Sequence, residues 1–137
     1  MKVVYLETSA FLTWLFDEPD ASEVMSTVNT AELIVTSSLI EVETLRACNR
    51  ALREKLIDSH QHKVITESFK SQKKGWFVMN IDEEVVLRAS RDFPIEPLRS
   101  LDALHLATAL EYRKLYPHCR VLSLDKRIRE NAAALGM

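Results

Sequence analysis

Four acidic residues occur where predicted strands end or predicted helices begin. They are Glu7, Glu43, Asp102 and Asp125. The first and last of them follow apolar runs directly, and the other two lie near the start of predicted helices. Because the carboxyl ends of parallel strands meet at one edge of a sheet, we expect the four carboxylates to surround one pocket.

Clustered carboxylates repel one another and raise one another's pKa values unless a counter-charge is present. A hard divalent cation supplies that charge, since Mg²⁺ and Mn²⁺ prefer oxygen ligands and Mg²⁺ usually retains several waters. Such an ion can activate water for attack on a phosphodiester. The alternative is that each acid is a solvated surface charge, or that Asp102 and Asp125 serve as helix N-terminal residues and Glu7 favours the helix that follows it.

The elements that would position these acids alternate between strands and helices. The uninterrupted apolar run Val3–Leu6 predicts a strand that is buried on both faces, and Leu33–Thr36 predicts a second buried strand. Trp76–Ile81 predicts a short strand, and Val121–Leu124 predicts the last strand. Helical patterns fill the intervals. This order predicts an α/β/α sandwich with a central, mostly parallel sheet of four or five strands, and 137 residues fit one domain, 1–137.

The predicted helix after the second strand carries both an acid and a row of arginines. Ser38 and Glu41 have the spacing of a capping box at its start. Its predicted core stripe comprises Leu39, Val42, Leu45, Asn49, Leu52 and Leu56. Beside that stripe, three- and four-residue spacing aligns Glu43, Arg46, Arg50 and Arg53. The arginines are either an ordinary solvated face or a surface that binds anionic groups.

Composition excludes several other classes of function. With only 2 glycines, the chain lacks a Gly-rich phosphate loop, and a net charge of −2 means that any nucleic-acid contact needs a local basic face. Cys48 and Cys119 have no metal or disulfide spacing, which favours packed, reduced thiols in a cytoplasmic protein. We expect neither a signal peptide nor a membrane-spanning segment.

Histidine and tryptophan side chains have simpler expected roles. His105 follows Asp102 by three residues, and we expect a packed, hydrogen-bonded histidine because a hard-cation site does not need imidazole. His60 and His62 would point to different faces of a helix. Trp14 and Trp76 are expected to be core or interface anchors, since no basic aromatic cluster surrounds them.

Four segments of this chain resemble, in order, the signature segments of the PIN-domain family, particularly its VapC-type toxins. The segments are VVYLETSAF, SSLIEVETLRA, LRSLDALHLATAL and VLSLDKRIRENAAALG, and they span nearly the whole chain. The resemblance assigns catalysis and metal binding to Glu7, Glu43, Asp102 and Asp125. It assigns supporting hydroxyl groups to Thr8, Ser9 and Ser123.

The resemblance implies a Mg²⁺- or Mn²⁺-dependent endoribonuclease that acts as the toxin of a type II toxin–antitoxin pair. Its implied partners are an RNA substrate, a small VapB-like antitoxin and a second copy in a homodimer. Arg46 and Arg50 would then contact RNA or the antitoxin. A structure-directed nuclease of RNA processing or repair is a further alternative, which the absence of appended domains disfavours.

This sequence departs from the family pattern at Glu7, where the family nearly always has Asp. The extra methylene displaces the carboxylate by roughly 1.5 Å. Misplacement on that scale can lower a rate by about 10²-fold. The alternative function is therefore a PIN-like module that binds RNA or protein and has weak or no nuclease activity.

Overall fold

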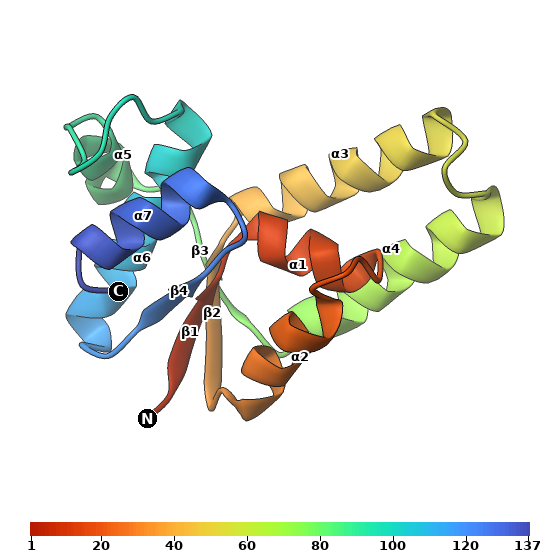
Figure 1. Ribbon diagram of the computed structural model, residues 1–137, viewed down its shortest axis with the longest axis horizontal. Coiled ribbons are helices and arrows are strands. Elements are labelled where there is room, and N and C mark those ends of the chain that lie inside the picture. Colours follow the sequence, from red (N-terminus) through yellow and green to blue (C-terminus); the bar gives the residue numbers. More distant parts are fainter.

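A four-stranded parallel sheet lies at the centre of the computed structural model, which describes residues 1–137 (Figure 1). The strands are β1 (Val3–Leu6), β2 (Leu33–Ser37), β3 (Phe77–Met79) and β4 (Arg120–Leu122). Their order is β3-β2-β1-β4, and all three neighbouring pairs are parallel. The predicted parallel α/β sandwich is confirmed, with four strands, although β3 and β4 are shorter than predicted.

Seven helices cover the two faces of the sheet. They are α1 (Thr8–Leu15), α2 (Ala21–Thr30), α3 (Leu39–Arg53), α4 (Ser59–Lys73), α5 (Glu83–Ala89), α6 (Ser100–Leu115) and α7 (Lys126–Ala134). Helices α1–α4 lie on one side of the sheet and α5–α7 on the other, and α3 and α4 extend together away from the sheet (Figure 1). None of the helices combines the length and apolar character needed to cross a bilayer.

The side chains of β1 divide the core into two halves. Val3 and Tyr5 pack into the cluster formed with α5–α7, whereas Val4 and Leu6 pack into the cluster formed with α1–α4. All four residues are buried, because successive side chains of a strand point to opposite faces and both faces are covered. The carboxyl end of this central strand is therefore held rigidly from both sides.

Helix α3 is rotated relative to the sequence-based prediction. Val42 and Leu56 of the predicted stripe are 58% and 73% exposed. The buried residues of the helix are Leu39, which the prediction included, and Ile40, Thr44, Cys48 and Ala51, which it did not. Small side chains in this set allow α3 to pack closely against α1 and α4. The predicted stripe is confirmed at Leu39 and partly at Leu45, which packs against the core, and it was wrong at Val42 and Leu56. The prediction favoured large apolar residues over the small ones that are buried here.

The predicted capping box at the start of α3 is also absent. Ser38 has helical backbone angles and its side chain makes no capping hydrogen bond. The hydroxyl of Ser37 at the end of β2 accepts a hydrogen bond from the Leu39 backbone N–H instead, at 3.1 Å. The two cysteines are buried and free, in agreement with the predicted packed thiols.

Candidate active site

One pocket of about 530 Å³ at the carboxyl edge of the sheet is lined by all four candidate acids. Glu7 comes from the end of β1, Glu43 from α3, Asp102 from the first turn of α6, and Asp125 from the residue before α7. The pocket also contains Thr8, Ser9, Arg46, Arg50 and Arg53. The fold thus brings together an acidic cluster and the arginine row of α3.

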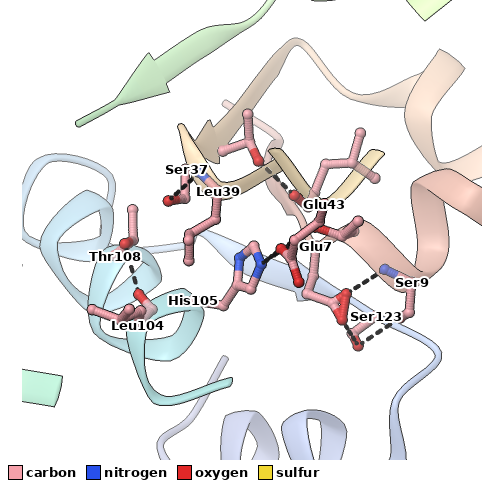
Figure 2. Close-up of polar contacts among 12 residues, drawn as sticks. Glu7, Ser9, Ser37, Leu39, Glu43, Leu104, His105, Thr108 and Ser123 are labelled. Atoms are coloured by element: carbon pink, nitrogen blue, oxygen red, sulfur yellow. Dashed lines mark hydrogen bonds and ion pairs between the residues drawn. The ribbon is translucent and has the colours of Figure 1, made fainter. Parts of the chain in front are cut away.

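Glu7 is held inside the protein by both of its carboxylate oxygens. Its side chain is 4% exposed. Oε2 accepts a hydrogen bond from the Ser9 backbone N–H at 2.5 Å, and Oε1 accepts one from the Ser123 hydroxyl at 3.1 Å (Figure 2). Burial raises the pKa of Glu7, while the charge of His105 and these hydrogen bonds oppose that rise. Glu7 is also the N-cap of α1.

The hydroxyl groups of Ser9 and Ser123 join the end of β1 to the segment after β4. They lie 3.2 Å apart. Ser9 Oγ accepts a hydrogen bond from the Leu124 backbone N–H at 2.9 Å, and Ser123 Oγ accepts one from the Asp125 backbone N–H at 3.0 Å. These contacts fix Glu7 and Asp125 relative to each other, since both acids are attached to the same small hydrogen-bonded unit.

Glu43 is a half-buried acid with two partners on one oxygen. Its Oε1 accepts a hydrogen bond from the Thr8 hydroxyl at 2.7 Å and lies 2.6 Å from Nε2 of His105 (Figure 2). Burial alone would raise the pKa of Glu43. The hydrogen bond and charge of His105, together with the Thr8 hydrogen bond, outweigh burial and lower it.

His105 is packed and hydrogen-bonded, as the sequence predicted, but its partners were not foreseen. The side chain is 2% exposed and connects Glu43 to the buried hydroxyl of Tyr5, which lies 2.7 Å from Nδ1. The sequence carried a partial signal for Tyr5, because in an extended chain a residue two positions before Glu7 points to the same side as Glu7. No sequence signal connected either residue to Glu43.

Replacing Glu43 by Gln should destabilise the metal-free protein in a pH-dependent way. A carboxylate whose pKa is lowered by folding contributes stability above its unfolded pKa of about 4.3, and that contribution is lost as pH falls through the folded pKa. We expect Glu43→Gln to lower Tm by roughly 3–6 °C at pH 7. Thermal unfolding in EDTA at pH 7 and pH 3.5 should show the difference shrinking in acid; an equal difference at both pH values would contradict the assignment.

Asp102 and Asp125 differ in how they are held. Asp102 has no hydrogen-bond or ion-pair partner. Its pKa is raised by burial, then by the charge of Asp125, with His105 and Arg99 opposing the rise. Asp125 caps α7, where its Oδ1 accepts a hydrogen bond from the Ile128 backbone N–H at 3.0 Å. Asp125 therefore has the capping role that the sequence left open, and it also lines the pocket.

The donor set of this pocket fits a hydrated hard cation. All four candidate ligands are carboxylates, and neither lysine nor arginine forms an ion pair with any of them. No three Asp, Glu, His or Cys side chains converge closely enough to hold an ion by themselves. Mg²⁺ is commonly bound through one or two carboxylates with waters completing its shell. The pocket is therefore suited to water-assisted binding rather than to a closed protein cage.

His62, Trp14 and Trp76 lie outside this pocket. His62 Nε2 is 2.9 Å from Oδ1 of Asn49, which connects α4 to α3. Trp14 and Trp76 both pack edge-on against Phe11, with ring centroids 5.6 and 4.9 Å away. The predicted role of the two tryptophans as packing anchors is confirmed within the core.

Comparison with known proteins gives a consistent result over almost the full chain. Residues 4–134 match the PIN domain family. Ribonuclease VapC46 of Mycobacterium tuberculosis is 29% identical over 137 residues, which cover 100% of this chain and 95% of that protein. Ribonuclease VapC35 of the same species is 28% identical, with 98% of this chain and 93% of that protein covered.

Proposed function

Because this chain belongs to the PIN-domain family, we propose that it is a metal-dependent endoribonuclease and the toxin of a type II toxin–antitoxin pair. The observation that carries the proposal is the single pocket lined by four carboxylates and three arginines. The names of two relatives as ribonucleases support it. When bound, Mg²⁺ or Mn²⁺ would supply a water of lowered pKa and neutralise charge on a phosphodiester.

Each acid has a proposed role that follows from how it is held. Asp102 is the main ligand, since no partner within the chain competes for its oxygens. Glu43 is the second, through the oxygen that Thr8 and His105 leave free. Glu7, held by Ser9 and Ser123, adds negative charge beside them, and Asp125 acts through water. Together these side chains orient the ion's waters toward the scissile phosphate.

The arginine row of α3 is the proposed binding surface for the phosphates that flank the cleavage point. Arg46 and Arg50 are exposed and line the same pocket as the acids. Arg46 lies about one helical turn from Glu43, so a backbone phosphate bound there would adjoin the acidic cluster. In this proposal a VapB-like antitoxin places carboxylates on the same arginines, and it inhibits cleavage by occupying the RNA-binding surface.

Substituting Arg46 or Arg50 by Gln should weaken RNA binding more than it lowers kcat, the rate of cleavage of RNA that is already bound. We expect KM to rise by roughly 10-fold. The slope of the logarithm of the RNA-binding constant against the logarithm of the salt concentration should become shallower by about the amount that one phosphate contact contributes. RNA binding at several salt concentrations measures both effects. Lys63→Gln is the control, because Lys63 is exposed on α4 and does not line the pocket. Equal losses in all three variants would contradict a specific arginine surface.

Cleavage of RNA by the purified protein in Mn²⁺, abolished by EDTA and restored by added Mn²⁺, is the test of the proposed function. Asp102→Asn protein purified in parallel controls for contaminating nuclease. Persistent cleavage in EDTA, or cleavage that survives in the variant, would overturn the assigned site.

A specific observation favours the alternative of a PIN-like binding module with weak or no nuclease activity. Both oxygens of Glu7 are engaged by Ser9 and Ser123, and no three acids close around one point. RNA binding without cleavage in either Mg²⁺ or Mn²⁺ would select this alternative. Homodimerisation and binding of a small antitoxin are further parts of the proposal. Sizing of the protein alone, and of the protein mixed with the product of a neighbouring small gene, tests both. We also propose a cytoplasmic location.

A further inference from the structure

A buried hydrogen-bonded chain extends from the core of the sheet to the pocket. Tyr5 on β1 is fully buried, and its hydroxyl lies 2.7 Å from Nδ1 of His105. On the opposite side of the same ring, Nε2 lies 2.6 Å from Oε1 of Glu43. Figure 2 shows the imidazole directed at the Glu43 carboxylate. Three residues from β1, α6 and α3 thus form one connected unit.

The proton positions in this unit follow from donor and acceptor counting. A phenol keeps its proton at neutral pH, so the Tyr5 hydroxyl is able to act as a hydrogen-bond donor. When the imidazole is neutral, this hydroxyl can donate to Nδ1, which leaves the ring proton on Nε2. Nε2–H then donates to Glu43, whose ionised carboxylate only accepts. The hydrogen bond from the Tyr5 hydroxyl therefore favours the Nε2–H tautomer, which is the one that can donate a hydrogen bond to Glu43.

The two oxygens of Glu43 are used differently. Oε1 receives hydrogen bonds from both Thr8 and His105, whereas Oε2 has no hydrogen-bond partner within the chain. A free glutamate side chain samples several rotamers, and fixing one oxygen removes much of that freedom. One oxygen is consequently an anchor and the other remains available to a ligand in the pocket.

We propose that His105, fixed in turn by Tyr5, is a positioning residue that anchors Oε1 of Glu43 and presents Oε2 to the bound metal ion. This inference rests on the proposed function, because it requires Glu43 to be a ligand. A purely structural histidine would contribute packing and stability without affecting what Glu43 binds. Groups that orient metal ligands typically affect metal affinity by 10- to 100-fold, which makes the two roles separable.

Mn²⁺ affinity of the full chain, measured by calorimetry, is the primary readout. We expect His105→Phe to weaken Mn²⁺ binding by about 10- to 100-fold and Tyr5→Phe by a smaller factor. His105→Gln should restore part of the loss, because its amide N–H can donate to Oε1. In a Glu43→Gln background the His105 change should cause no further loss, since a residue that acts through Glu43 is not additive with it.

Tyr112→Phe is the matched control for Tyr5→Phe. Tyr112 is a buried tyrosine whose hydroxyl donates to the backbone carbonyls of Thr36 and Phe77, away from the pocket. Its variant should lose stability and retain wild-type Mn²⁺ affinity. In metal-free protein, nitrogen NMR should find the Nε2–H tautomer of His105 in the wild type and a mixture in Tyr5→Phe.

Each contrary result has a defined meaning. Unchanged Mn²⁺ binding and cleavage in Glu43→Gln would remove Glu43 from the ligand set and overturn this inference while leaving the proposed function intact, whereas a wild-type protein that neither binds Mn²⁺ nor cleaves RNA would overturn the proposed function itself. Weakened binding in Glu43→Gln, with wild-type affinity in folded His105→Phe and Tyr5→Phe, would overturn only the positioning role. If His105→Phe does not fold, Tyr5→Phe decides alone, because it removes a single oxygen: wild-type Mn²⁺ affinity in it overturns the inference. An Nδ1–H tautomer in the wild type would do the same.

Discussion

Asp102→Asn is expected to lower metal-dependent RNA cleavage by about 10²- to 10³-fold while the fold remains intact. Asp102 lines the pocket and has no partner within the chain, so the amide removes charge from the site without leaving a partner unsatisfied. Burial and Asp125 raise the pKa of Asp102. Its ionised form therefore disfavours folding at neutral pH, and Tm should stay level or rise in the variant.

Cleavage rates in Mg²⁺ and thermal unfolding in EDTA measure the two expected effects of the Asp102 change. Asp92→Asn is a matched control, because Asp92 is an exposed aspartate outside the pocket. It should retain wild-type activity. An Asp102→Asn protein that cleaves RNA as fast as this control would remove Asp102 from the catalytic set.

Glu7→Asp is expected to raise Mg²⁺-dependent cleavage, by up to about 10²-fold if carboxylate placement is the whole defect. The longer side chain now reaches Ser123 with one oxygen and the Ser9 N–H with the other. Aspartate is a better N-cap and can retain the backbone contact while withdrawing from Ser123. Mg²⁺ requires near-ideal octahedral geometry at roughly 2.0–2.1 Å, so affinity should tighten together with the rate.

The Glu7 comparison requires equal Mg²⁺, because Mn²⁺ could mask part of a geometric defect. Loss of one buried methylene and one hydrogen bond should lower stability by about 1–2 kcal/mol, which denaturant unfolding can measure. Glu18→Asp is the control, since Glu18 is exposed between α1 and α2. If Glu7→Asp is no faster than the parent protein, the chain has adapted to Glu7 and the longer acid is no handicap.

Local sequence determined the strands, the burial of the two central ones and the type of residue at the carboxyl edge of the sheet. Val3–Leu6 is apolar without interruption because helices cover both of its faces, and Glu7 follows it by covalent adjacency alone. The same adjacency puts Asp125 shortly after β4. Patterns of this kind depend on neighbours within one element, so they can be recognised in the sequence before any tertiary contact is known.

Tertiary structure alone decided which face of α3 is buried and how the acids are held. The buried face depends on how closely α1 and α4 approach, which favoured Thr44, Cys48 and Ala51 over larger apolar side chains. His105 meets Glu43 across 62 positions of sequence, and Ser123 meets Glu7 across 116. Residue type specifies which hydrogen bonds a side chain can make, but only packing of distant elements brings a particular donor within reach of a particular acceptor.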